Sequence, residues 1–360
     1  MCSCAKLWSK SFEQPVKTDG PERSSGWNNI HFHSLVAPWA VTLTPAEHSL
    51  IVYFLMVAGL VFLFGLLRTW ATGREVGARY RVAVTARLGV MGVAFASYLF
   101  LTVAFLSGYD RVGSGFRPNS GAMLAFTGRY MEWSVTVPLL VVELLAVCTL
   151  IGQANRKTLG IAAAGGFLMI FTGYLGNAVT DGELSIQQLI VWGGVSCVFW
   201  IATTVVLVLT VRRSMPELTA EAAGLLRNAT WVLLGGWVIY PLVYAIQIVA
   251  IGGQWTTTMQ IVYTVSDVTV KLGFAGLIHR IAKLRTAEDV RAGDDVHPEA
   301  IWIDSVKQSD AGLPVVVYLA EGAIINASRP KPPGGTAAAS HPEASPGIDE
   351  SSAAQDSLEL

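Results

Sequence analysis

Seven long apolar stretches, separated by short polar ones, occupy the middle of the chain between about residues 48 and 284. The hydrocarbon core of a bilayer is about 30 Å thick, and a helix needs around 20 apolar residues to cross it. The pattern therefore predicts an all-α fold, a bundle of seven transmembrane helices. We expect these helices at residues 48–69, 82–107, 120–150, 158–179, 187–211, 223–251 and 257–284.

Polar segments flank the predicted bundle on both sides. Residues 1–47 form a polar N-terminal segment. Residues 285–327 form an extension in which 301–306 and 313–319 have strand-like patterns, so we expect a small β-hairpin there. Residues 328–360 are rich in Pro, Gly, Ala and Ser, a composition typical of disorder.

Composition supports a membrane protein. Charged residues make up 14% of the chain, against about 25% in a typical soluble domain. The net charge of −1 gives no sign of a nucleic-acid partner, and we expect none. His31 and His33 form a pair that could suggest a metal site, but we expect them to be solvated and the chain to hold no metal ion.

The loops predict an orientation, because Lys and Arg are enriched in short cytoplasmic loops. Alternate loops are basic, whereas the others hold Asp181 and Glu183 or, over 252–258, no charge. We therefore expect the N-terminus outside and the C-terminus inside a plasma membrane. The basic side chains in or beside the cytoplasmic loops are Arg68, Arg74, Arg79, Arg81, Arg156, Lys157, Arg212, Arg213, Arg280, Lys283 and Arg285.

Two predicted helices carry ionisable side chains at membrane depth, where a charge is costly and usually marks function. Asp267 and Lys271 are four residues apart and share a face of the seventh helix. Glu132, Thr136 and Glu143 share a stripe of the third helix. At ~1.5 Å per residue, Glu132 lies ~18 Å and Lys271 ~21 Å from the outer side, and Glu143 lies ~16.5 Å inward of Glu132. A carboxylate can therefore face the amine, although an ion pair that only fixes helix packing has the same pattern.

Aromatic side chains accompany these charges. Trp133 follows Glu132, and the sixth helix supplies Trp237, Tyr240 and Tyr244. Aromatic residues at helical spacing usually pack in the hydrophobic core and have no other role. Beside a buried lysine and two carboxylates, they favour a slot for a flat polyene.

These residues resemble those of the microbial rhodopsins, and the resemblance covers all seven helices. The third helix reads Arg129-Tyr-x-Glu132-Trp133-x-x-Thr136-x-Pro-Leu-Leu. The sixth reads Trp-x-x-Tyr-Pro from residue 237, and the seventh Asp-x-x-x-Lys-x-Gly-Phe from residue 267. Weaker matches are Phe-Ala-Ser-Tyr at 95–98 and Thr-Gly at 172–173.

The resemblance implies that Lys271 carries all-trans retinal as a protonated Schiff base. Glu132 and Asp267 are then its counterions, Glu132 accepts the Schiff-base proton, and Arg129 gates the outer side. The implied pocket residues, whose two tyrosines hydrogen-bond around Asp267, are Tyr98, Trp133, Thr136, Leu140, Gly173, Trp192, Trp237 and Tyr240.

The resemblance has further implications. Glu143 falls where proton pumps of the proteorhodopsin type have their cytoplasmic proton donor. Such proteins are not enzymes, and they assemble as trimers or pentamers in, we expect, a bacterial plasma membrane. Gly193, after Trp192, opens space where a carotenoid antenna binds in some members, but we favour a glycine that serves helix packing.

The sequence departs from that of a pump at three places. Glu132 stands where most pumps have Asp, and residues 252–258 lack the acidic release pair of archaeal pumps. Arg87 aligns with a small hydroxyl residue that contacts the donor in pumps. It lies ~7.5 Å deep and Glu143 ~10 Å deep from the cytoplasmic side, so the two can pair. Alternatively, Arg87 extends to the interface.

A paired Arg87 has a kinetic consequence. An adjacent cation holds the Glu143 carboxylate ionised, so that it has no proton to give and the deprotonated, blue- or UV-absorbing form persists. These features resemble the cryorhodopsin group, which implies a slow photoreceptor or photoswitch with weak proton translocation. It would signal through its cytoplasmic extension or a soluble transducer. The alternative is an outward light-driven proton pump with Glu132 as acceptor and Glu143 as donor.

Overall fold

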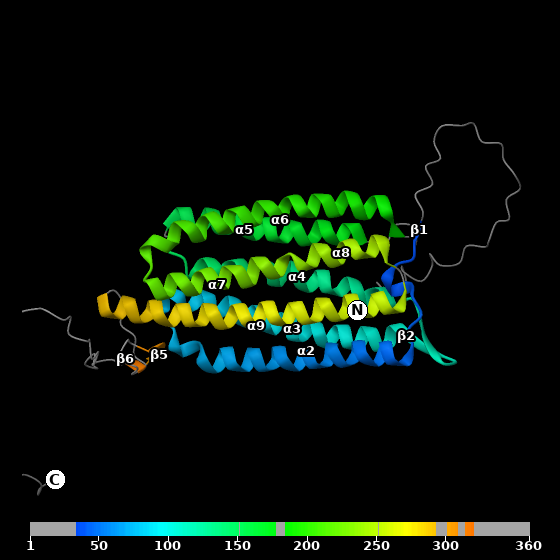
Figure 1. Cartoon of the computed structure of the whole chain (residues 1–360), viewed down its shortest axis with the longest axis horizontal. Helices are drawn as coiled ribbons and strands as arrows, with labels where there is room; N and C mark the ends of the chain where they lie inside the picture. The colour runs from blue at the N-terminus through cyan, green and yellow to red at the C-terminus, as the bar shows by residue number, and fades with distance from the viewer. Residues whose placement is uncertain are drawn as a thin grey trace, which may run out of the picture. The chain divides into compact units, whose positions relative to one another are not determined.

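The computed structural model describes residues 34–150, 152–177, 184–250, 252–292, 301–308 and 314–319. The chain divides into two units, Met1–Glu299 and Ala300–Leu360. The first unit is a bundle of long helices that run side by side (Figure 1). Its helices are α2 (Pro45–Thr72), α3 (Arg81–Gly108), α4 (Ala122–Ala146), α5 (Gly152–Asn177), α6 (Ile186–Ser214), α7 (Ala220–Trp237), α8 (Ile239–Val249) and α9 (Gly253–Ala292).

Seven crossings are present in the described part of the chain, as predicted, because α7 and α8 together form one. Pro241 lacks the N–H that would bond the Trp237 carbonyl, so the helix breaks at Val238. By length and composition, six of the crossings in the described residues are apolar enough to span a membrane. The seventh is α4, which carries Arg129, Glu132 and Glu143 within its 25 residues.

Polar caps start several of these helices where the apolar stretches begin. At α2, the Thr44 hydroxyl accepts from Glu47 N, and the Glu47 carboxylate accepts from Thr44 N at 2.8 Å. The side chains of Ser185 and Thr219 cap α6 and α7 in the simpler way, by accepting one backbone N–H. Caps of this kind satisfy N–H groups that have no partner within the helix.

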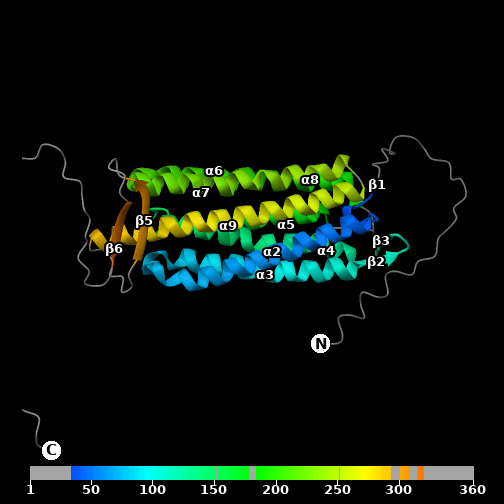
Figure 2. The ribbon, with the colours of Figure 1, turned by 60° about the horizontal axis from the view of Figure 1, so that its bottom comes forward.

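Short elements close the two ends of the bundle. At one end, which we call the hairpin end, β2 (Tyr109–Val112) pairs antiparallel with β3 (Gly115–Pro118), and β1 (Ser34–Leu35) with β4 (Leu184–Ser185). Figure 2 shows β1, β2 and β3 together there, near the helix η1 (Pro38–Ala40).

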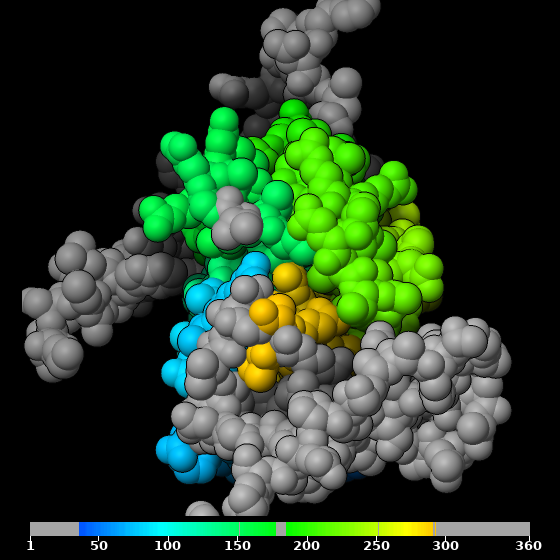
Figure 3. All heavy atoms as spheres, turned by 90° about the vertical axis from the view of Figure 1, so that its left-hand side faces the viewer, coloured from blue at the N-terminus to red at the C-terminus, as the bar shows by residue number. Residues whose placement is uncertain are grey.

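The opposite end, which we call the basic end, contains the α2–α3 and α6–α7 connections and the last turns of α9. It includes the 3-10 helices η2 (Gly73–Glu75), η3 (Ala78–Tyr80) and η4 (Met215–Glu217). Figure 3 looks onto this end, where the orange end of α9 lies between blue atoms of the α2–α3 region and green atoms of the α6–α7 region.

Three helix boundaries at this end differ from the prediction by four residues or more. Helix α4 stops at Ala146, four residues early, and α5 begins at Gly152, six residues early. Helix α9 continues to Ala292, eight residues beyond its apolar stretch. The extra turns are held by polar contacts rather than by lipid: Arg285 Nη1 donates to Val147 O at 2.8 Å, and Tyr80 Oη donates to Asp289 Oδ2 at 2.7 Å. Charges mark where the apolar stretch ends, but they do not end the helix.

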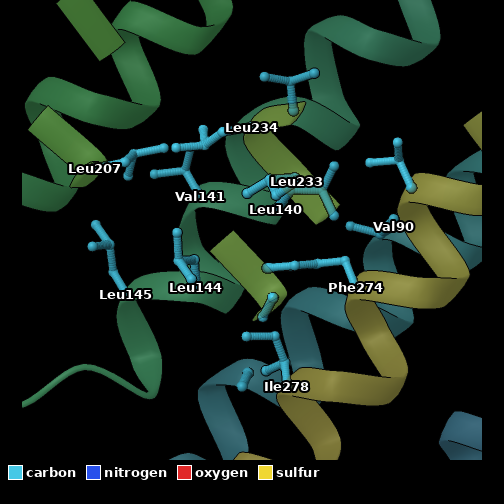
Figure 4. Close-up of a cluster of buried hydrophobic side chains, with 14 of the residues drawn as sticks. Val90, Leu140, Val141, Leu144, Leu145, Leu207, Leu233, Leu234, Phe274 and Ile278 are labelled. Atoms are coloured by element: carbon cyan, nitrogen blue, oxygen red, sulfur yellow. The ribbon is translucent and has the colours of Figure 1, made fainter. Parts of the chain in front are cut away.

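An apolar layer fills the bundle on the basic side of Lys271. It joins side chains from α3, α4, α6, α7 and α9, part of which Figure 4 shows. Its labelled members are Val90, Leu140, Val141, Leu144, Leu145, Leu207, Leu233, Leu234, Phe274 and Ile278. This layer separates Lys271 from water at the basic end.

The second unit contains a hairpin. Strand β5 (Ile301–Gln308) pairs antiparallel with β6 (Pro314–Leu319), with an irregular register between Ser305 and Gln308. The expectations for His31 and His33, for Asp181 and Glu183 and for the 328–360 tail lie outside the described residues.

Candidate functional site

Lys271 lies in the interior of the bundle between two carboxylates. Its Nζ donates to Glu132 Oε1 and to Asp267 Oδ1, each at 2.6 Å. Asp267 comes from the preceding turn of α9, and Glu132 is brought by the neighbouring α4. The three residues are 1–4% exposed, so water does not screen their charges. A buried amine held in this way can exchange its proton with either carboxylate.

Neighbouring side chains fix the two carboxylates. The Thr136 hydroxyl donates to Glu132 Oε1 at 2.8 Å. Asp267 Oδ1 accepts from Trp133 Nε1 at 3.3 Å and from Tyr240 Oη at 3.2 Å. Asp267 is thus held by two donors besides the amine. The Glu132 carboxylate is on a longer side chain and has one such donor, Thr136.

Arg129 lies on the hairpin side of Glu132 and is buried. Its guanidinium donates to Gln260 Oε1 at 2.8 and 3.0 Å, to Thr264 Oγ1 at 2.8 Å and to Tyr98 Oη at 3.0 Å. All these partners are neutral. The structure therefore places Tyr98 against Arg129, and only Tyr240 of the two predicted tyrosines hydrogen-bonds to Asp267.

Gln260 and Thr264 are site residues that were not predicted from the sequence. They precede Asp267 and Lys271 on α9 with spacings of four, three and four, so all four share one helical face. That spacing was the signal that could have identified them.

A cavity of about 310 Å³ extends from Lys271 between α4, α5, α6, α7, α8 and α9. Its wall is almost entirely apolar and aromatic. Five of the predicted pocket residues line it: Trp133, Leu140, Gly173, Trp237 and Tyr240. The other lining residues include Tyr130, Met169, Gly193, Ser196, Trp200, Tyr244 and Tyr263.

Three predicted pocket residues do not line the cavity. Tyr98 is held at Arg129, and Thr136 turns toward Glu132. Trp192 lies against Gly176 of α5, because the cavity-facing stripe of α6 passes through Gly193 and Trp200 instead. The tryptophan that α6 contributes is Trp200, eight residues further along.

The cavity fits a long, flat, apolar group attached to Lys271. Trp133 meets Tyr240 edge to face, with ring centroids 4.9 Å apart, and Tyr240 stacks on Tyr263 at 5.9 Å. A Cβ added at Gly173 would come within 3.4 Å of Ser196 and 3.6 Å of Tyr130, so a larger side chain there would fill the space. Retinal has the shape and polarity that this wall accommodates.

A second buried ion pair lies on the basic side of Lys271. Arg87 Nε donates to Glu143 Oε1 at 2.8 Å, and the two residues are 3% and 0% exposed. Of the two sequence alternatives, the structure thus has Arg87 paired inside the bundle rather than extended to the interface. Within the described residues, Arg87 Nη2 and Glu143 Oε2 are buried without a hydrogen-bond partner.

Comparisons with known proteins agree with this geometry. The model of bacteriorhodopsin-like proteins matches residues 48–284. Archaerhodopsin-3 of Halorubrum sodomense is 28% identical over 236 residues, which cover 64% of this chain and 84% of the relative. A blue-light absorbing proteorhodopsin from gamma-proteobacterium Hot 75m4 is 25% identical over 232 residues, 63% of this chain and 81% of the relative.

A solved structure gives the same result. Xanthorhodopsin, described as a light-driven ion pump with dual chromophore, superposes with a TM-score of 0.63 at 26% identity, covering 69% of this chain and 98% of xanthorhodopsin. The family match spans all seven crossings and both buried ion pairs. The chain therefore belongs to the bacteriorhodopsin-like family, the multi-pass microbial rhodopsins that bind retinal on a lysine and act as light-driven pumps or photoreceptors rather than as enzymes.

Proposed function

We propose that this protein is a retinal photoreceptor or photoswitch with a slow photocycle, in which Lys271 carries all-trans retinal. The observation that carries the slow cycle is the buried Arg87–Glu143 pair at 2.8 Å. A pump needs a protonated donor at Glu143, and this contact favours the ionised carboxylate. The resemblance to the cryorhodopsin group belongs to the same proposal.

The light-driven step begins at Nζ of Lys271. Bound retinal supplies a light-driven isomerisation that displaces the charged nitrogen from its carboxylates. Glu132 then accepts the Nζ proton, because its Oε1 lies 2.6 Å from the nitrogen and its side chain is the less tightly held of the two. Asp267 stays ionised, since Trp133 and Tyr240 donate to it.

The electrostatics of the outer side support that transfer. Lys271 and Arg129 balance Glu132 and Asp267 in a region shielded from water. When the proton moves to Glu132, Arg129 still balances Asp267. Arg129 acts as a gate on the outer side, and the hydrogen-bond partners that hold its guanidinium, Gln260, Thr264 and Tyr98, are neutral.

Return of the proton to Nζ is the slow step. Arg87 holds Glu143 ionised, and the apolar layer between Glu143 and Lys271 excludes water. The Nζ-deprotonated state therefore persists, and with it the blue- or UV-absorbing form. A persistent form suits a light-sensitive switch better than a fast pump.

Orientation, assembly and partners complete the proposal. The basic end faces the cytoplasm of a bacterial cell, and the N-terminus lies outside the plasma membrane, as the Lys and Arg content of the loops favours. The chain assembles as a trimer or pentamer and signals through its C-terminal extension or a soluble transducer. No carotenoid binds, because Tyr244 covers Gly193: a Cβ added there would lie 2.8 Å from the tyrosine ring.

The second candidate is an outward proton pump with Glu132 as acceptor and Glu143 as donor. It is favoured by the burial of Glu143 on the basic side of Lys271, where a protonated carboxyl is stable if Arg87 moves away. Flash photolysis combined with pH recording of illuminated cells separates the two. A deprotonated state that lasts seconds, without steady acidification, supports the switch. Decay within tens of milliseconds with steady acidification supports the pump.

A further inference from the structure

His279 lies in a polar cluster that has no role in the photocycle proposed above. It lies on α9 just over two turns beyond Lys271, toward the basic end. Its Nε2 is 3.3 Å from Glu75 Oε2, and the same oxygen lies 2.8 Å from Lys283 Nζ. The side chain of His279 is 13% exposed and that of Glu75 is 37% exposed, so the pair reaches from the interior to the surface.

Three buried polar atoms without a hydrogen-bond partner in the described residues lie in this region: His279 Nδ1, Arg87 Nη2 and Glu143 Oε2. A buried polar atom of this kind destabilises the fold unless water satisfies it. Water is held inside proteins where several polar groups converge. These three atoms therefore carry unused hydrogen-bonding capacity between Glu75, which reaches the surface, and the buried Glu143.

The register of the helices puts His279 level with Arg87. Tyr80, the residue just before α3, contacts Asp289 of α9, and equal counting along both helices from that contact sets Arg87 level with residue 282. Gly65 of α2 lies against both Met91 and Leu272, and counting from these sets Arg87 level with residue 276. The two counts bracket His279, so the imidazole and the Arg87 guanidinium lie at about the same level of the bundle.

We propose that His279 is the proton relay that feeds Glu143 from the basic end, an inference that rests on the proposed slow return of the proton to Lys271. Since Arg87 holds Glu143 ionised, the returning proton must come from solvent. Histidine can take up a proton on one ring nitrogen and release one from the other, which suits it to a relay. Within the described residues the histidines are His48 and His279, and His48 lies at the hairpin end.

Over the whole transfer the imidazole neither gains nor loses a proton. One ring nitrogen takes up a proton from the Glu75 side, and the other nitrogen releases its own proton toward Glu143 Oε2. The neutral ring is restored when the tautomer exchanges. The charged groups around the ring are Glu75 from η2, Arg87 from α3 and Lys283 from α9. The proton therefore passes from the Glu75 side to the Glu143 carboxylate, past the cations Arg87 and Lys283.

The test measures decay of the Nζ-deprotonated state after a flash, in the full-length retinal-loaded protein in lipid nanodiscs, from about pH 5 to pH 8. His279→Gln keeps a hydrogen-bonding group but cannot titrate. Glu221→Gln is the matched control. It removes the α7 carboxylate that pairs at 3.3 Å with Arg280, the residue next to His279 on α9. An unchanged visible band shows that each variant folds and binds retinal.

We expect His279→Gln to slow the decay about 100-fold, the lower end of the range by which a positioned acid accelerates a proton transfer. The substitution should also abolish the acceleration of the decay at low pH. Added imidazole should restore the rate, and Glu221→Gln should behave as wild type. An unchanged rate and pH profile in His279→Gln overturns the relay, and so does equal slowing in both variants with the pH profile kept. Fast wild-type decay with steady acidification would instead contradict the slow photocycle, so the two failures are distinct.

Discussion

The Arg87–Glu143 pair gives the sharpest prediction, because one substitution changes which protonation state Glu143 adopts. At 2.8 Å and an effective dielectric constant of about 20, the attraction between the two charges is about 6 kcal/mol. Desolvation of a buried carboxylate costs several kcal/mol and opposes ionisation. The two effects are similar in size, so loss of Arg87 leaves desolvation unopposed. In Arg87→Ala, Glu143 should be protonated and able to donate.

The expected result is a faster photocycle. A positioned proton donor contributes about 10²–10⁴-fold to a transfer rate, so the lifetime of the Nζ-deprotonated state should fall by about 100-fold in Arg87→Ala. Flash photolysis of the retinal-loaded protein measures that lifetime. Arg280→Ala is the matched control, because it removes a 42% exposed arginine at the same end of the bundle.

A double variant tests the cause. If Glu143 supplies the proton, Arg87→Ala with Glu143→Gln should return the slow decay, since glutamine has no proton to give. The coupling between the two sites is then read from the cycle of single and double variants. Unchanged decay in Arg87→Ala, or fast decay kept in the double variant, would refute the reasoning.

Three further predictions concern the site around Lys271. Lys271→Ala should remove the visible absorption band that added retinal produces, and a band that survives would refute the assignment of the attachment site. Glu132→Gln should keep the band, shifted to longer wavelength because an anion is lost beside Nζ, and should show no deprotonated state after a flash at neutral pH; a normal deprotonation signal would exclude Glu132 as acceptor. Gly173→Ala should bind retinal normally, since the new Cβ makes ordinary contacts at 3.4 Å or more. Gly173→Trp should lose most of the band by filling the cavity, and equal band intensity in the two variants would show that the cavity is not the retinal site.

The fold was largely predictable, because burial in lipid leaves a strong pattern. Seven apolar stretches gave seven crossings. The break at Val238 follows from Pro241 of the sixth-helix motif, because proline lacks a backbone N–H. The end of α9 was not predictable from hydropathy. Its last turns depend on contacts such as Arg285 with Val147, which join segments far apart in the sequence.

The charged centre of the site was predictable for a similar reason. Lys271, Asp267 and Glu132 are conspicuous where charges are rare, and helical counting put them at one depth. Side-chain direction was harder to predict. Whether Trp192 or Trp200 faces the cavity depends on the rotation of α6 about its axis, which its nearly uniform apolar sequence does not specify.

The central claim is that light at Lys271 produces a stored state rather than rapid transport. The most direct measurement is a time-resolved absorption trace of the full-length protein, loaded with all-trans retinal, after a single flash. The account predicts that the visible band is replaced by a blue- or UV-absorbing band that lasts for seconds or longer. Recovery of the visible band within tens of milliseconds, with steady acidification around illuminated cells, would contradict it.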